Sequence, residues 1–292
     1  MIMTKIYDCF TFFNELDLLE LRLMELYDVV DKFVIVEANK TFSGKPKNFV
    51  FEENKLRYKK YLKKIIYIKV KNFPPQKYPK LYNLLVHSKI KKIKGISYNL
   101  GIGPWTLEYF QRNAIMRGLK NLKDKDIVLI SDLDEIPSKE GILLAKKKLL
   151  NNECERIIFK MTFFVYWYNA FRNNLWYGTK AVLGKTLKFK LKTQPQIIRT
   201  GLVEIIKTKI LHLKYLKDII IESGWHFSYM GGIEKVKEKI QSFAHTESDY
   251  NKLPFINDEL GLKYIKITKQ FPKWIYNNRL KLIKLKLAIK LK

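Results

Sequence analysis

Apolar runs and one amphipathic segment alternate along the first forty residues. Apolar and aromatic residues dominate 6–13 and again 33–39, which predicts two strands. Between these segments Leu19, Leu23 and Leu26 recur at the spacing of one apolar helix face. A strand, an amphipathic helix and a second short apolar strand form a βαβ unit, so we expect the two strands to be parallel.

The same alternation of strand and helix continues into the middle of the chain. Further strands and helices are predicted in turn at 65–70, 106–120, 127–131 and 138–150. The segment 71–105 is rich in proline and glycine, which predicts an irregular connection with one short helix near 81–90. Residues 157–169, IIFKMTFFVYWYN, predict a long aromatic strand region.

The second half of the chain has a weaker pattern. Short strands are expected near 181–184 and 197–199, and GGIEKVKEKIQSFAH at 231–245 predicts a helix with one apolar side. No internal repeat or compositional break precedes residue 250. We therefore expect an α/β fold with a mostly parallel central sheet flanked by helices, formed by one domain at 1–250 and followed by a basic extension at 251–292.

The final segment, RLKLIKLKLAIKLK at 279–292, mixes basic and apolar residues without a consistent period. On a helical projection its basic residues fall on opposite sides, and strict alternation fails at Leu282-Ile283. Two interpretations follow: peripheral contact with an anionic membrane, or a frayed surface extension.

Composition is typical of a globular chain with a well-filled core, because 47% of the residues are apolar and 14% are aromatic. No run approaches the roughly 20 apolar residues of a membrane-spanning helix. The start lacks the apolar run of a signal peptide, since Asp8 falls inside it. We therefore expect a cytoplasmic protein, or one on the cytoplasmic face of a membrane. Cys9 and Cys154 are too few and too far apart for a metal knuckle, and we expect two buried thiols.

The formal net charge of +28 predicts anionic partners. Nucleic acid, anionic lipid and nucleotide sugars all meet that condition. The lysines are spread over the whole chain, which is more typical of a solvated surface than of one binding groove. No zinc-finger spacing, aromatic RNA-binding run or basic region with heptads accompanies them, so no specific nucleic-acid partner is expected.

Four acids follow a buried strand in VLISDLDEIPSKE at 128–140. Because alternate residues of an extended chain point the same way, Asp132 and Asp134 face one side while Leu133 turns inward. Two carboxylates at the carboxyl end of a parallel strand suit one divalent cation that carries a diphosphate. The alternative is that these acids belong to the start of the next helix, although Ser138 can cap that helix unaided.

Two further side chains are candidates with ordinary structural alternatives. Arg112 precedes the acidic strand on a predicted helix, where Glu108 one turn earlier makes a surface ion pair possible. The guanidinium of Arg112 also suits the acids or a phosphate. His226 lies in SGWHFSYMGG between two aromatic residues, which favours a core histidine when this histidine is considered alone.

Several blocks of this chain, taken in order, resemble glycosyltransferase family 17. They are YDCFTFFNELDLLELRLMEL, VDKFVIVEANKTFSGKPK, WTLEYFQRNAI, VLISDLDEIP and GWHFSY, and they span roughly residues 5 to 250. The resemblance implies a GT-A-like nucleotide-diphospho-sugar transferase fold and a UDP-sugar donor, UDP-N-acetylglucosamine in characterised members. It also implies Mn²⁺ or Mg²⁺, a glycan acceptor and inversion at the anomeric carbon.

The resemblance also implies roles for individual residues. Asp132 and Asp134 match the Asp-x-Asp motif that holds metal and nucleotide, and His226 is expected to complete the metal site or touch the diphosphate. Glu37, Asn14 and Glu15 lie at strand ends that face the nucleotide. For Glu37 the alternative is a surface acid. Arg112 is expected to act at the catalytic site, reaching the metal-binding acids or the phosphates.

Inverting transfer needs a base, and the sequence does not single one out. Glu135, adjacent to the Asp-x-Asp motif, is the first candidate. Other acids are Asp218, Glu222, Glu247 and Asp249.

Three rival functions remain at this stage: a related transferase that uses UDP-glucose or UDP-galactose, a glycoside hydrolase with two carboxylates, and a non-enzymatic basic module for lipid or nucleic acid.

Overall fold

The computed structural model describes residues 4–86, 101–199, 216–231, 233–242 and 262–291. Its strands form a nine-stranded sheet in the order β3-β2-β1-β4-β7-β6-β8-β5, with β9 paired to β7. The strands are β1 (Ile6–Phe12), β2 (Lys32–Ala38), β3 (Ile65–Val70), β4 (Ile127–Asp132), β5 (Glu135–Ile136), β6 (Arg156–Val165), β7 (Ala170–Leu183), β8 (Asp218–Ser228) and β9 (Lys263–Tyr264).

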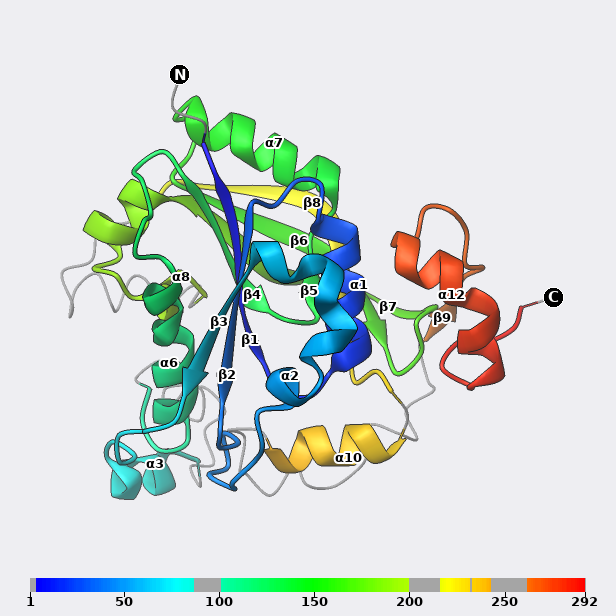
Figure 1. Ribbon diagram of the computed structural model, residues 1–292, viewed down its shortest axis with the longest axis horizontal. Coiled ribbons are helices and arrows are strands. Elements are labelled where there is room, and N and C mark those ends of the chain that lie inside the picture. The colour runs from blue at the N-terminus through cyan, green and yellow to red at the C-terminus, as the bar shows by residue number, and fades with distance from the viewer. Residues whose placement is uncertain (1–3, 87–100, 200–215, 232, 243–261, 292) are drawn as a thin grey trace.

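Helices cover the sheet and its ends (Figure 1). The α-helices are α1 (Leu16–Leu26), α2 (Val50–Glu53), α3 (Pro79–Val86), α6 (Trp105–Asn113), α7 (Lys139–Leu150), α8 (Pro195–Arg199), α10 (Ile233–Ser242) and α12 (Lys273–Lys284). Shorter 3-10 or π segments are η1 (Lys55–Lys64), η2 (Ala114–Gly118) and η3 (Thr186–Lys190).

The α/β class is confirmed, but the expectation of a mostly parallel sheet is wrong. The pairs β1–β2, β2–β3, β1–β4 and β6–β8 are parallel, whereas β4–β7, β6–β7, β5–β8 and β7–β9 are antiparallel. The sheet is therefore mixed. Its parallel half contains the predicted βαβ unit, because a helical crossover returns the chain in the same direction. In the other half, β6 and β7 are joined by a connection too short for such a crossover, so they run antiparallel.

Alternate side chains of β1 supply the cores on the two faces of the sheet. Phe10 and Phe12 pack in the cluster that contains the apolar face of α1, including Leu19. Tyr7 and Cys9 belong to a second cluster on the other face, which includes η2. Both cysteines are buried free thiols, as expected. A two-sided core of this kind fixes the strand register, because a slip of one residue would exchange the two faces.

One predicted strand is a helix instead. Residues 197–199 lie in α8, which begins at Pro195, a residue that suits the first turn of a helix. The predicted helix at 106–120 is divided into α6 and η2. Residues 87–90 and 243–245 of two other predicted helices lie outside the described residues, as does the expected domain boundary at residue 250.

The basic C-terminal segment contains a packed helix. In α12, Trp274, Ile275 and Leu282 are buried and join the cluster that contains α1. Figure 1 shows α12 beside β9 near the C-terminus. Two of these three residues precede 279 and the helix ends at Lys284, which explains why the pattern of 279–292 alone indicated no face.

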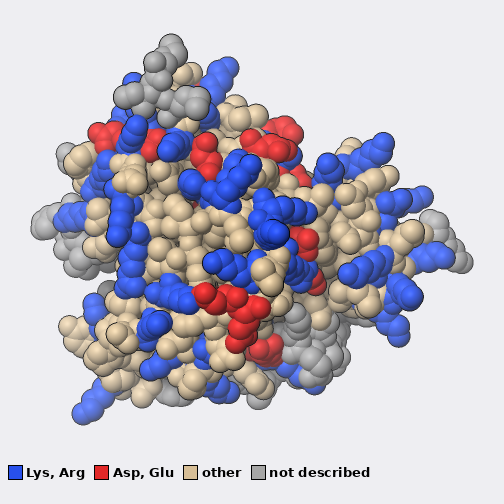
Figure 2. Space-filling model, in the orientation of Figure 1, with Lys and Arg blue, Asp and Glu red and all other residues tan. Residues whose placement is uncertain are grey.

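Basic side chains are dispersed over the visible face in Figure 2, with smaller groups of acids between them. This distribution matches the solvated surface expected from the scattered lysines. None of the helices in the described part of the chain is both long and apolar enough to span a bilayer.

Candidate active site

A cavity of about 610 Å³ lies at the carboxyl ends of β1, β2 and β4. This is the edge at which α/β sheets bind ligands, and the volume suits a small-molecule ligand. The charged or titratable side chains that line it are Glu15, Lys40, Lys47, Glu108, Arg112, Asp132, Asp134, Arg199, Tyr229, His226 and Lys239. Five of the predicted site residues line this one cavity: Glu15, Arg112, Asp132, Asp134 and His226.

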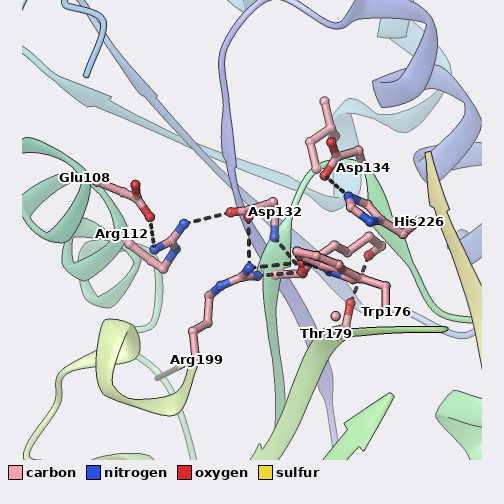
Figure 3. Close-up of polar contacts among 12 residues, drawn as sticks. Glu108, Arg112, Asp132, Asp134, Trp176, Thr179, Arg199 and His226 are labelled. Atoms are coloured by element: carbon pink, nitrogen blue, oxygen red, sulfur yellow. Dashed lines mark hydrogen bonds and ion pairs between the residues drawn. The ribbon is translucent and has the colours of Figure 1, made fainter. Parts of the chain in front are cut away.

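Asp132 lies between two arginines (Figure 3). Arg112 Nη2 donates to Asp132 Oδ1 at 2.7 Å, and Arg199 Nη2 donates to Oδ2 at 2.9 Å. Arg112 also binds Glu108 at 2.8 Å and the side-chain oxygen of Gln196. Arg112 is buried whereas Asp132 is partly open to the cavity, so two guanidiniums, each held in place by carboxylates, stand at the cavity wall beside Asp132.

Glu135 is fully buried behind the cavity wall. Arg199 donates to both of its carboxylate oxygens, at 2.5 and 3.0 Å, and the Trp176 indole N–H donates to Oε1 at 2.8 Å. Burial raises the pKa of Glu135, but the charge and hydrogen bonds of Arg199 outweigh burial and bring that pKa to about 2. This environment suits a permanent carboxylate that orients Arg199. To accept a proton, Glu135 would have to leave these partners.

Asp134 pairs with the amino group of Lys239 from α10. Lys239 Nζ lies 2.8 Å from Asp134 Oδ2 and 3.6 Å from Glu15 Oε1. Burial raises the pKa of Asp134, but the Lys239 charge and then His226 hold that pKa well below its usual range. Burial lowers the pKa of Lys239. The nearby charges of Asp134 and Glu15 outweigh burial, so the pKa of Lys239 is raised above its usual value. Both groups are therefore charged at neutral pH.

His226 is held in an aromatic stack next to Asp134. Its ring lies 4.9 Å from Phe163 and 4.6 Å from Trp176, between centroids, and its Nε2 lies 3.6 Å from Asp134 Oδ1. Among the described residues, none forms a hydrogen bond with His226 Nδ1, which is buried. His226 thus combines the two interpretations made from sequence, since it packs as a core residue and also lines the cavity.

The glycine of the GWH block fixes the strand that carries His226. Gly224 has φ +94°, and a Cβ at this position would lie 2.4 Å from the carbonyl oxygen of Ile136. This close approach accompanies the pairing of β5 with β8, in which Glu135 is opposite His226. A side chain at position 224 would push these two strands apart.

The backbone after β4 is organised by Arg22 of α1. Arg22 Nη1 donates to the carbonyl oxygens of Asp132, Leu133 and Glu135, at 3.0, 3.0 and 2.8 Å. Three carbonyls that converge on one cation turn the chain sharply. This turn separates Asp132 and Asp134, so the first pairs with arginines and the second with Lys239.

Glu37 lies behind the cavity. Its carboxylate accepts hydrogen bonds from Lys47 Nζ, the amides of Val50 and Phe51 at the start of α2, and the Tyr67 hydroxyl, at 2.7 to 3.1 Å. Glu37 is fully buried, so it is not the surface acid of the alternative interpretation. Lys47, which donates to this carboxylate, lines the cavity, whereas Glu37 does not.

The two residues after β1 differ in position. Glu15 lines the cavity, whereas Asn14 contributes its backbone N–H to the Glu15 carboxylate at 3.1 Å. Among the other acids considered as a base, Asp218 pairs with Arg156 and the exposed Glu222 pairs with Lys160, both away from the cavity. Glu247 and Asp249 lie outside the described residues.

Sequence reasoning missed Arg199, Trp176 and Lys239. Arg199 was assigned to a strand, and Lys239 is one of many lysines in a helix with the sequence EKVKEKI. A usable signal for Lys239 was its position one turn after the buried Val236, since a lysine on a buried helix side needs an acidic partner.

The described side chains do not fit a resident metal ion as they are arranged. Both oxygens of Asp132 are taken by arginines, and Lys239 occupies one oxygen of Asp134. Only Asp134 and His226, of the three predicted ligands, face one another. In the described part of the chain, no three His, Cys, Asp or Glu side chains are placed to hold one metal. Binding of Mn²⁺ or Mg²⁺ by these residues stays a prediction.

This chain is similar in sequence to two mammalian glycosyltransferases. The human and rat proteins named beta-1,4-mannosyl-glycoprotein 4-beta-N-acetylglucosaminyltransferase are each 31% identical over 137 residues. The match covers 46% of this chain and 22% of each relative, so the chain matches only about a fifth of their length.

Two solved structures have folds partly similar to this chain. A crystal structure of S. aureus TarS residues 1–349 with UDP has a TM-score of 0.45 at 13% identity, covering 98% of this chain and 76% of that one. The Francisella tularensis 2-C-methyl-D-erythritol 4-phosphate cytidylyltransferase has a TM-score of 0.41 at 11% identity, covering 82% and 100%. The family model of Glycosyltransferase family 17 matches residues 2–260, and the chain belongs to that family.

Proposed function

We propose that this protein transfers N-acetylglucosamine from UDP-N-acetylglucosamine to a glycan acceptor, with inversion, on a GT-A-like fold. Membership of the family supports sugar transfer. The names of the human and rat relatives support N-acetylglucosamine as the sugar and a glycan as the acceptor. The observation that carries the proposal is the cavity at the ends of β1 and β4, into which anchored basic side chains face.

Arg112 and Arg199 are the residues suited to the leaving diphosphate. Each guanidinium is fixed by acids, Arg112 by Glu108 and Asp132, and Arg199 by Asp132 and Glu135. A guanidinium fork matches phosphate oxygens, and donors that are already oriented stabilise developing charge without reorganisation. Glu135 acts in this proposal by positioning Arg199. Inverting transfer also needs a base for the acceptor hydroxyl. Glu135, the first candidate from sequence, would have to leave Arg199 and Trp176 before it could accept that proton.

Hydrolysis of nucleotide sugars without acceptor tests this function. The purified protein is incubated with UDP-N-acetylglucosamine, UDP-glucose, UDP-galactose or GDP-mannose, and released nucleotide is measured with and without Mn²⁺. We expect slow release that is fastest with UDP-N-acetylglucosamine, because a site that hydrogen-bonds the acetamido group discriminates against sugars lacking it. The sugar released first should be the β anomer by proton NMR.

Three results would count against parts of the proposal. A preference for UDP-glucose or UDP-galactose would replace the donor, and early release of the α anomer would replace inversion with retention. Failure to bind or cleave any UDP-sugar, with steeply salt-dependent binding to nucleic acid or anionic vesicles, would favour the non-enzymatic basic module instead.

A further inference from the structure

Helix α10 carries one lysine into the cavity. In Figure 1 this helix lies across the end of the sheet where the cavity-lining segments after β1 and β2 also lie. Its last turn is tied to the segment after β2, because Ser43 N donates to Ser242 O at 3.3 Å and Ser43 Oγ donates to Gln241 O at 3.0 Å. These contacts hold α10 where Lys239 lines the cavity.

The amino group of Lys239 occupies the position beside Asp134 that a bound cation would take. Its Nζ lies 2.8 Å from one oxygen of Asp134, whose side chain is only 9% exposed. The same Nζ lies 3.6 Å from Glu15 and 5.9 Å from the ring centre of Tyr229. Acids from the ends of β1 and β4 and one aromatic face thus surround a single ammonium group.

A second cation at this position would meet strong repulsion. Two like charges about 4 Å apart near a protein surface repel each other. Since Lys239 already compensates Asp134, and Arg112 and Arg199 already compensate Asp132, the acids of this motif have their positive partners within the chain. Three of the four acids at or after the end of β4, namely Asp132, Asp134 and Glu135, thus have basic partners within the chain.

We infer that Lys239 is a diphosphate-binding residue, which supplies beside Asp134 the positive charge expected there from a divalent metal. The inference rests on the proposed function, since it assigns a ligand group within the same cavity. Asp134 then acts as a positioning residue that holds the ammonium towards the phosphates. An ammonium is a compact donor that suits phosphate oxygens as a point charge.

Calorimetric titration with UDP tests the inference. Wild-type protein is titrated in EDTA and in Mn²⁺, alongside Lys239→Met, Lys239→Arg and the control Lys237→Met, which removes the same charge from the same helix. We expect wild type to bind UDP in EDTA with an affinity within about threefold of that in Mn²⁺. Lys239→Met should weaken binding by about 10- to 100-fold, the range for a lost hydrogen bond to a charged group, and Lys239→Arg should retain most of it. Lys237→Met should match wild type.

Other outcomes separate this inference from the proposed function. If wild type binds UDP only in Mn²⁺, or if Lys239→Met binds UDP as wild type does, Lys239 does not have this role while the transferase proposal stands. If UDP binds under neither condition, the proposed function fails and the inference with it. The two wild-type titrations decide the metal question even if Lys239→Met does not fold.

Discussion

The side chains of Arg22 and Asp8 form a fully buried ion pair with two hydrogen bonds. Arg22 Nε donates to Asp8 Oδ2 at 2.8 Å, and Nη2 donates to Oδ1 at 2.6 Å. The remaining nitrogen of the same guanidinium holds the backbone after β4, and Nη2 also reaches Ser131 Oγ at 2.6 Å. The βαβ unit at the start of the chain is therefore bonded directly to the segment that carries the acids.

Replacing Arg22 by methionine should destabilise the protein strongly. The variant leaves Asp8 as an unpaired buried charge and three carbonyls without their donor, a loss of about 3–5 kcal/mol in the free energy of unfolding. Urea unfolding followed by circular dichroism measures it. Arg57→Met is the control, because the partly exposed Arg57 pairs with Asp17 and Glu20 of α1. This variant should lose no more than about 1 kcal/mol in the free energy of unfolding. Equal losses in the two variants would contradict the special role of Arg22.

The parallel half of the sheet was predictable from sequence because its signals are local. The apolar period of α1 and the short runs of β1, β2 and β4 each lie within one segment, and the order of those segments indicates parallel strands. The carboxyl ends of parallel strands meet at one edge, so Glu15, Asp132 and Asp134 were expected together and do line one cavity.

The partners of the acids were not predictable in the same way. Asp8 served only as evidence against a signal peptide, because its partner Arg22 is recognised only when α1 is placed on β1. Lys239 lies 105 residues from Asp134 in sequence. A long-range pair carries no periodic signal, and in a chain with 56 lysines and arginines nearly every acid has many candidate partners. The antiparallel half was missed because strand pairing also depends on such distant contacts.

Replacing Arg199 by methionine should change how stability depends on pH. In wild type the pKa of Glu135, about 2, lies below its unfolded value of about 4.3, so this carboxylate stabilises the fold above pH 4.3 and loses that effect as pH falls towards 2. Without Arg199, burial should raise the pKa of Glu135 above the unfolded value. The loss in free energy of unfolding relative to wild type should then be larger at pH 7 than at pH 4.5.

Urea unfolding of wild type and Arg199→Met at both pH values checks this expectation. Lys188→Met serves as the control, since it removes an exposed pair with Asp124. If Arg199→Met loses more free energy of unfolding at pH 4.5 than at pH 7, Arg199 does not hold Glu135 in its charged form.

Two substitutions of His226 separate its packing from its imidazole nitrogens. His226→Ala removes the ring from between Phe163 and Trp176 and should lower the free energy of unfolding by about 1–3 kcal/mol. His226→Phe keeps an aromatic ring in the stack and should recover most of that stability. If Nε2 acts in the site through Asp134, both variants should lose donor hydrolysis. Full hydrolysis by a stable His226→Phe would reduce the residue to a packing role.

The variant Asp134→Asn distinguishes two roles of this carboxylate, a metal ligand and a residue that positions Lys239. As a metal ligand, Asp134 would be needed for UDP binding, and the amide would abolish it. As the residue that positions Lys239, it should be replaceable with limited loss, because the nucleotide phosphates can compensate the ammonium themselves. The variant should therefore be less stable alone, by about 1–3 kcal/mol, and should still show a rise in melting temperature on saturation with UDP in EDTA, somewhat smaller than the rise of wild type. The exposed-acid variant Asp124→Asn should behave as wild type. A wild-type response to UDP that requires Mn²⁺, and that Asp134→Asn lacks in Mn²⁺, would favour the metal ligand.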